Sequence, residues 1–167
     1  TKDADSLVPS FSRDGRSIYF ASNRTGTWQV YRSPVRGGDA EQVTQEGGFA
    51  AFETPSGDAV VYTRYTAPGL FEVPRQGGPE RQLLDRPRCW GHFAVAPDGL
   101  YLLDAREGQE TRLEMLPFGG VTPRSVTTLP LRPPCAESSL AAAPDGRFLL
   151  YVGVEETSDI ARIDGVP

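Results

Sequence analysis

The chain is poor in the residues that build metal and redox sites: its 167 residues include one histidine, two cysteines and one methionine. Three cysteine and histidine side chains are too few for a four-ligand structural zinc site, and one imidazole is too few for a metal-dependent lyase. The sequence has no Gly-rich phosphate loop, serine nucleophile elbow or zinc-binding helix motif. We therefore expect no catalytic, cofactor-binding or metal-binding residues in this chain.

Long apolar runs and strong charge are also lacking. No run approaches the roughly 20 apolar residues that span a bilayer, so we expect no membrane insertion. With 17 basic and 22 acidic residues the formal net charge is −5, which disfavours a nucleic acid or an anionic membrane as the main partner. The segment Thr1–Asp5 has no initiator methionine and no hydrophobic leader, so we expect a processed or excised chain whose compartment these residues do not reveal.

Glycine and proline, by contrast, are abundant, with 18 and 15 residues, and the glycines are periodic. Glycines that we expect in tight turns recur 42 to 47 residues apart, at Gly15, Gly57, Gly99 and Gly146. A Gly-Gly pair follows the same period, at residues 37–38, 77–78 and 119–120. Each turn leads into a short hydrophobic strand, and no window has a helical period. Repetition every ~40–50 residues is typical of β-propeller blades, so the chain is predicted to be all-β.

The first unit contains the string Pro9-x-Phe11-Ser12-x-Asp14-Gly15-x-x-Ile18-Tyr19-Phe20-x-Ser22-x-Arg24-x-Gly26-x-x-x-Val30-Tyr31, followed by the Gly37–Gly38 turn. This pattern resembles the repeats of TolB-like β-propellers, which are relatives of the WD-repeat proteins. The resemblance implies a non-enzymatic bacterial scaffold, often extracytoplasmic or joined to a signalling or hydrolase module. The third unit departs from the pattern, because Asp104-Ala105-Arg106-Glu107-Gly108 replaces the expected Ser-x-Arg-x-Gly turn.

We predict one propeller segment over residues 1–167, with four blades that are each a four-stranded antiparallel sheet. The blades are expected at approximately 9–44, 49–84, 93–129 and 139–165. The last blade is incomplete: its third strand is expected at Asp159–Ile163 and no outer strand follows. The segment is either part of a larger ring of about six to eight blades or an open propeller that stands alone or pairs with a second copy. Exposed blade faces and unpaired edges then predict self-association.

The two cysteines lie in similar settings, Arg86-Pro87-Arg88-Cys89 and Arg132-Pro133-Pro134-Cys135, each just before an expected inner strand. Equivalent loops of adjacent blades lie side by side, so a disulfide between Cys89 and Cys135 is sterically allowed if their Cα atoms lie within about 7 Å. Two buried free thiols are the alternative, and the spacing alone does not distinguish the two.

The loops that enter the inner strands rim the central channel of a propeller, and ligands commonly bind there. Trp90 lies on such a loop, whereas most other aromatic residues occupy repeat-equivalent strand positions and are expected to pack. A nucleophilic pair of Cys89 with His92 would lack a third, orienting group. The candidate partner-binding residues at this channel mouth are Arg88, Trp90, His92, Arg132 and Glu137.

Carboxylates with a clear position are expected to serve turns. Asp14, Asp98 and Asp145 each precede a turn glycine, where an Asp side chain bonds nearby backbone amides. We therefore expect a non-enzymatic binding module that recognises a protein or peptide partner, as part of a longer bacterial protein and with a periplasmic or other extracytoplasmic location favoured. The alternative is a gating propeller accessory to a serine hydrolase or peptidase whose catalytic domain lies outside this chain.

Overall fold

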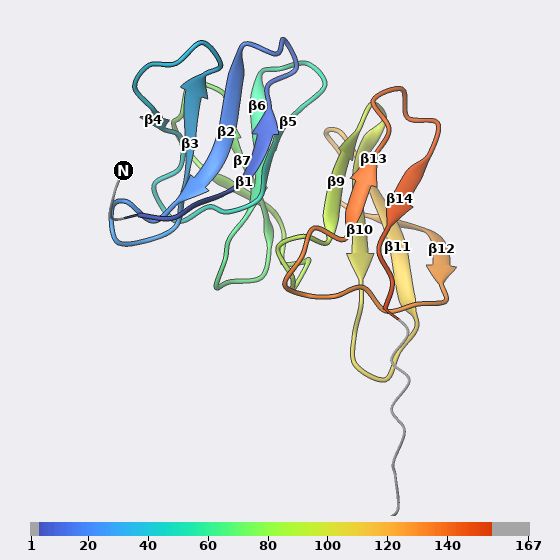
Figure 1. Ribbon diagram of the computed structural model, residues 1–167. Coiled ribbons are helices and arrows are strands. Elements are labelled where there is room, and N and C mark those ends of the chain that lie inside the picture. The colour runs from blue at the N-terminus through green and yellow to red at the C-terminus, as the bar shows by residue number, and fades with distance from the viewer. Residues whose placement is uncertain (1–3, 155–167) are drawn as a thin grey trace, which may run out of the picture.

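The computed structural model describes residues 4–154, which form an all-β structure of consecutive antiparallel sheets (Figure 1). Three sheets have four strands and the fourth has two. Within each sheet the strands follow one another in sequence order, as expected for propeller blades built from hairpins. The predicted all-β fold is therefore confirmed. Among these residues, no helix has the length and apolarity needed to cross a membrane.

The strands of the four sheets have the following bounds. The first sheet consists of β1 (Ser6–Phe11), β2 (Ser17–Ser22), β3 (Gln29–Pro34) and β4 (Glu41–Gln42). The second consists of β5 (Ala51–Glu53), β6 (Ala59–Thr63), β7 (Leu70–Pro74) and β8 (Arg81–Leu84). The third consists of β9 (Phe93–Ala96), β10 (Gly99–Asp104), β11 (Thr111–Pro117) and β12 (Arg124–Leu129). The fourth consists of β13 (Leu140–Ala142) and β14 (Leu149–Tyr151), and the strand predicted at 159–163 lies outside the described residues.

Three of the four periodic glycines occupy left-handed turns, as predicted. Gly15, Gly57 and Gly146 have φ values of 65°, 73° and 71°, which favour a residue without a Cβ. The prediction was wrong for Gly99, which is the first residue of β10 and pairs with Ala96. The third hairpin turns in only two residues, so its glycine falls on the strand.

The aspartates that precede these glycines also differ between the third hairpin and the others. Asp14 and Asp145 accept hydrogen bonds from the amides of Arg16 and Arg147, at 3.0 and 3.1 Å. Asp98 instead accepts the hydroxyl hydrogen of Tyr101, at 2.9 Å. The predicted Asp–amide bond therefore occurs in two of the three turns, because the tighter third turn places its carboxylate beside a strand residue.

The hydrophobic core consists of layers between successive sheets. The buried side chains of one layer come from β2, β3 and the segment after β4 on one side and from the second sheet on the other: Tyr19, Val30, Val43, Ala51, Val60, Tyr62, Phe71 and Val73. A second layer joins the second and third sheets, and a third joins the third and fourth. The second and third sheets are thus each sandwiched between two neighbours, which is the packing that the apolar β6 strand predicts.

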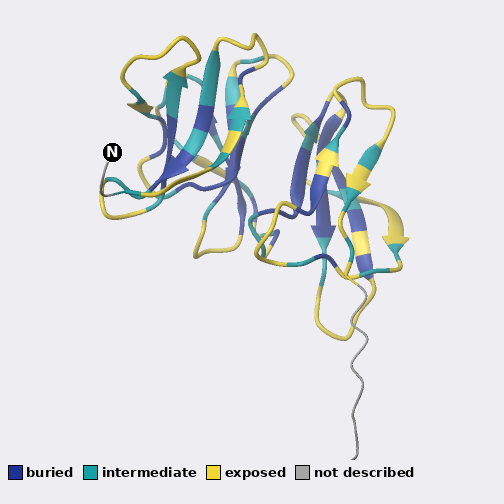
Figure 2. Ribbon diagram, in the orientation of Figure 1, coloured by how far each residue is buried: buried dark blue, intermediate teal, exposed yellow. Residues whose placement is uncertain are grey.

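The two end sheets contain exposed residues (Figure 2), and several of these residues are apolar. On the first sheet Phe11 is 66% exposed, and on the fourth sheet Phe148 and Leu150 are 55% and 63% exposed. The alternate side chains of β14, Leu149 and Tyr151, pack against the third sheet. The exposed faces are therefore the sides on which a further propeller blade would stack.

Candidate functional site

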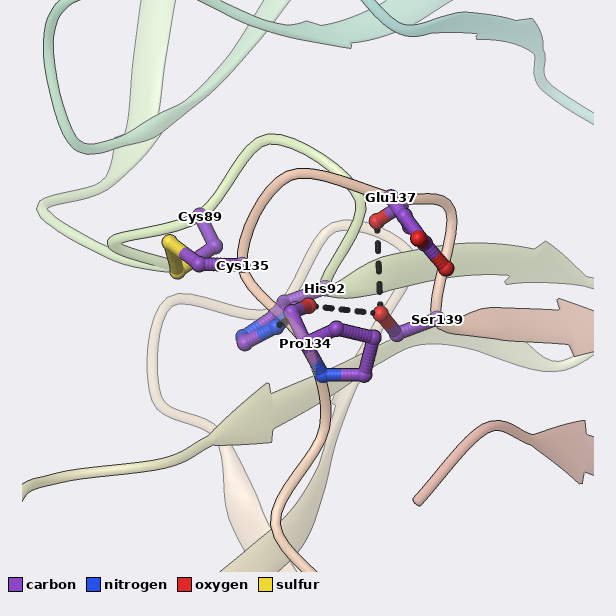
Figure 3. The surroundings of a disulfide bond; sticks show 6 residues. All are labelled: Cys89, His92, Pro134, Cys135, Glu137 and Ser139. Atoms are coloured by element: carbon purple, nitrogen blue, oxygen red, sulfur yellow. Dashed lines mark hydrogen bonds between the residues drawn. A yellow bond between two sulfur atoms is a disulfide. The ribbon is translucent and has the colours of Figure 1, made fainter. Parts of the chain in front are cut away.

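Two loops that lead into inner strands meet at one rim of the array. They are residues 85–92, between β8 and β9, and residues 130–139, between β12 and β13. Cys89 of the first loop and Cys135 of the second form a disulfide, with their Cα atoms 5.0 Å apart (Figure 3). Neither cysteine is a free thiol in this structure. A covalent bond thus joins loops that enter consecutive blades.

Close backbone packing reinforces this junction. The amide of Ser139 donates to the carbonyl oxygen of Gly91 at 2.9 Å. A Cβ at position 91 would collide with the carbonyl group of Glu137. Only glycine therefore allows the two loops to approach this closely.

His92 connects the same loops from the inside. Its ring is buried, and Nε2 donates to the carbonyl oxygen of Pro134 at 3.0 Å, since a carbonyl can only accept. The same oxygen accepts the hydroxyl hydrogen of Ser139 at 2.9 Å (Figure 3). Burial lowers the pKa of His92, and the nearby Arg132 guanidinium lowers it further. The imidazole is therefore neutral at neutral pH and serves as a hydrogen-bond donor that holds the second loop.

A cavity of about 440 Å³ opens beside the disulfide. Three loops contribute to it: the two joined by the disulfide and the β10–β11 connection. Its walls are formed by Arg88, Cys89, His92, Ala105, Arg106, Glu107, Arg132, Pro133 and Cys135. The lining thus includes three arginines, one glutamate and apolar residues.

The structure brings three of the five predicted site residues together, because Arg88, His92 and Arg132 line one cavity. Trp90 does not line it: the indole makes an edge-to-face contact with Phe49, with ring centroids 5.0 Å apart. The Trp90 carbonyl accepts the hydroxyl hydrogen of Thr63 at 3.0 Å, which ties the loop to the second sheet. Trp90 therefore positions the 85–92 loop by packing.

Glu137 also lies apart from this cavity. Its side chain is exposed and points away from the disulfide (Figure 3), while its carbonyl oxygen accepts the hydroxyl hydrogen of Ser139 at 3.2 Å. The backbone of Glu137, rather than its carboxylate, is therefore what contributes to the loop junction.

Sequence reasoning missed Arg106 and Glu107 as cavity residues. Both lie on the β10–β11 loop, and the Arg106 guanidinium pairs with Asp104 at 3.1 Å. A signal was present, since this is the segment where the third unit departs from the Ser-x-Arg-x-Gly turn. That departure did not reveal which neighbouring loops the new side chains would face.

A second hollow, of about 480 Å³, lies between the first two sheets and involves the equivalent connections β2–β3, β4–β5 and β6–β7. Trp28 and Tyr65 line it, and their ring centroids lie 5.9 Å apart. In residues 4–154 no group of three or more His, Cys, Asp or Glu side chains is arranged to hold a metal ion.

No protein-family model matches this sequence. Over 79 residues the chain is 42% identical to the uncharacterized protein Atu1656 of Agrobacterium fabrum strain C58. The match covers 46% of this chain and 27% of that protein.

Solved structures resemble the chain over most of its length. TolB from Acinetobacter baumannii matches with a TM-score of 0.69 at 20% identity, covering 89% of this chain and 37% of TolB. A candidate TolB of Agrobacterium tumefaciens gives 0.71 at 18% identity, covering 92% of this chain and 61% of that one. A puromycin-hydrolyzing peptidase of Mycobacterium tuberculosis gives 0.59 at 12% identity, covering 78% and 23%.

These likenesses confirm the TolB-like β-propeller fold that the first repeat predicted. The chain spans less than two thirds of the length of each of these proteins. Its three four-stranded sheets and one two-stranded sheet correspond to part of a propeller.

Proposed function

We propose that this chain is a non-enzymatic binding module, part of a longer bacterial protein, that recognises a protein or peptide partner at the rim formed by loops 85–92 and 130–139. The observation that carries the proposal is the cavity beside the Cys89–Cys135 disulfide. Ligands bind preferentially in concave sites where a few polar groups converge on apolar walls.

The way the rim is held also supports binding. Loops usually lose conformational entropy when they bind, and this loss reduces affinity. Here the disulfide, the Gly91–Ser139 hydrogen bond and the His92–Pro134 hydrogen bond already fix both loops. Exposed side chains such as Arg88 and Arg132 are thereby presented from a fixed backbone, so binding requires no further ordering of the backbone.

A peptide-display selection against the 167-residue chain tests this proposal. We expect selected peptides to lose binding to an Arg88→Ala/Arg132→Ala variant, because both side chains line the cavity and neither is buried. The matched control is Arg13→Ala/Arg36→Ala, which removes two exposed arginines from the turns of the opposite rim. Peptides that bind all three proteins equally would refute recognition at this rim.

A Trp90→Ala/Arg88→Ala variant adds a second test. Because Trp90 packs against Phe49, its loss is expected to shift the 85–92 loop as a whole and to weaken binding more than Arg88→Ala alone. The comparison is made in the full-length protein. If the protein with the double substitution captures the partner with the same affinity as the unmodified protein, the proposed channel-mouth site is wrong.

A gating role beside a serine hydrolase or peptidase domain is a second candidate function. The structural likeness to the puromycin-hydrolyzing peptidase supports it. The match covers only 23% of the peptidase chain, so a propeller segment like this one is part of a much larger protein there. The catalytic domain would lie outside these 167 residues. A serine-reactive fluorophosphonate probe that labels the full-length protein, together with a Gly-x-Ser-x-Gly motif in the flanking sequence, would favour this role over a simple binding module.

An extracytoplasmic location follows as a further proposal from the disulfide. Structural disulfides persist in oxidising compartments such as the periplasm and are rare in the cytosol. Protein taken from cells and alkylated without reductant is expected to show no mass increase at Cys89 or Cys135. Two alkyl groups per chain would place the protein in a reducing compartment.

A further inference from the structure

We propose that the cavity beside the disulfide binds a carboxylate group of the partner, held between the guanidinium groups of Arg88 and Arg132. This inference rests on the proposed binding function and specifies its chemistry. The carboxylate belongs either to an Asp or Glu side chain or to the free C-terminus of a peptide.

The argument begins with charge. The chain as a whole has a net charge of −5, yet the cavity has three guanidinium groups against one carboxylate, that of Glu107. Arginine presents a planar fork of N–H donors that matches the two oxygens of a carboxylate. A local positive site on an acidic surface favours one compact anionic group over a polyanion such as a nucleic acid, which the rest of the surface would repel.

The arginines of the cavity differ in their existing partners. Arg106 pairs with Asp104, whose side chain is 9% exposed, so its charge is already compensated. Arg88 and Arg132 form no ion pair within residues 4–154. These two guanidinium groups therefore have hydrogen-bond donors to offer to a ligand.

The repeat supplies an internal comparison for Arg132. Arg86 occupies the equivalent position in the first Arg-Pro-x-Cys loop, and it pairs with Glu114 on β11 at 3.0 Å. The same loop design thus uses its first arginine to bind a carboxylate in one blade. In the next blade, Arg132 lines the cavity, and the strand equivalent to β11 lies outside the described residues.

The loop junction sets the spacing of the two unpaired arginines. Arg88 directly precedes Cys89, and Arg132 lies three residues before Cys135. Both arginines therefore belong to the two loops that the disulfide joins, and both line the same hollow. The methyl group of Ala105 and the ring of Pro133 leave an apolar wall for the aliphatic part of a ligand.

An NMR titration of the ¹⁵N-labelled chain with three small probes tests the inference. N-acetylglutamate α-amide offers a side-chain carboxylate, N-acetylglycine offers a terminal carboxylate, and N-acetylglutamine α-amide is the neutral match of the first. We expect the carboxylates to shift the arginine side-chain signals and the His92 ring signal with a Kd on the order of 1 mM. The carboxylate probe with the lower Kd identifies whether the partner supplies a side-chain carboxylate or a C-terminal carboxylate.

The variants Arg88→Gln and Arg132→Gln are expected to weaken carboxylate binding about tenfold or more each, because each removes charge-assisted hydrogen bonds. Arg36→Gln, an exposed arginine on the β3–β4 turn, removes the same charge far from the cavity and should leave binding unchanged. Equal binding of the neutral glutamine probe, or equal weakening by Arg36→Gln, would overturn the inference. Unchanged amide spectra outside the cavity establish that each variant is folded.

The display selection separates this inference from the proposed function. Peptides that require Arg88 and Arg132 but keep their affinity after Asp→Asn and Glu→Gln exchange and C-terminal amidation would leave peptide recognition intact and refute the carboxylate site. Carboxylate probes that bind while no peptide depends on the rim would support the carboxylate site and refute peptide recognition.

Discussion

Gly91 lies against the backbone of Glu137 so closely that no Cβ fits between them. The two residues belong to loops that enter different sheets, and this contact, together with the disulfide beside it, positions the cavity. The proposed binding site thus depends on a junction between blades rather than on the architecture of a single blade.

Gly91→Ala is therefore expected to destabilise the chain by about 2 kcal/mol or more, because the backbones must separate to admit the methyl group. Gly108→Ala is the control: Gly108 has open space around it and φ of 70°, so only the left-handed backbone penalty of roughly 1–2 kcal/mol applies. Urea unfolding curves compare the two variants. An unchanged unfolding midpoint for Gly91→Ala would show that the loops admit the methyl group without loss and would contradict the close packing.

Loss of the disulfide is expected to lower the free energy of unfolding by up to about 4 kcal/mol. The bond closes a loop with a sequence separation of 46 residues, and the chain-entropy estimate for a loop of that length gives this value. Urea unfolding of the Cys89→Ser/Cys135→Ser variant measures the effect. Added reductant should then destabilise the unmodified chain and leave the double variant unchanged; equal sensitivity of the two would contradict the assignment.

Glu53 is expected to be the most sensitive polar residue between the first two sheets. Its side chain is 1% exposed, accepts the hydroxyl hydrogen of Tyr19 at 2.6 Å and pairs with Arg75 at 3.2 Å. The carboxylate also accepts the backbone amide hydrogen of Arg13 at 2.7 Å, so Glu53→Gln should cost about 2 kcal/mol because a charged acceptor among three donors is replaced by an amide. A double-mutant cycle with Tyr19→Phe should show coupling, and additive effects would argue against the hydrogen bond.

Tyr19 also predicts an alkaline transition. Burial, reinforced by Glu53, raises the pKa of Tyr19 to about 12. Because the raised pKa favours the protonated folded state, this contribution to stability is complete below about pH 10 and is lost as the pH rises toward 12. The unfolding free energy of Tyr19→Phe should therefore fall less steeply over that range than that of the unmodified chain.

His92 predicts an acid-sensitive junction. Since burial lowers its pKa in the folded state, the contribution to stability is present above the unfolded pKa of about 6.5 and is lost as the pH falls through the folded value. His92 is the only histidine, so one imidazole NMR signal reports its titration directly. We expect a midpoint below 6.5 and a flatter pH–stability curve for His92→Gln; a midpoint above 6.5 would contradict the buried, neutral state.

Self-association is expected through the exposed faces of the first and fourth sheets. Light scattering of the concentrated chain should give a mass above that of the monomer, since blade faces bury apolar surface against one another. A Phe11→Ser/Leu150→Ser variant should reduce this mass, whereas Val121→Ser, at an 86% exposed turn residue away from both faces, should not. A monomeric mass at high concentration would rule out association of the isolated chain.

Much of the fold was predictable because its signals are local. A periodic glycine such as Gly15 or Gly146 indicates a hairpin turn, because glycine tolerates the left-handed backbone that the turn needs. An apolar strand after the turn indicates the interior of a blade. The exception, Gly99, shows the limit of this logic. Its lack of a side chain is required by the carbonyl of Leu116 on the neighbouring strand, a contact that the residues next to it do not encode.

The candidate site was predictable only in part for the same reason. The sequence by itself determined that the chain repeats a strand-and-turn unit and that two Arg-Pro-x-Cys loops precede inner strands, because both are properties of neighbouring residues. Only the tertiary structure decided that Trp90 turns toward Phe49 and that Arg106 joins Arg88 and Arg132 around one hollow. Those outcomes depend on how loops from three connections dock, and docking is governed by contacts between residues that are distant in the chain.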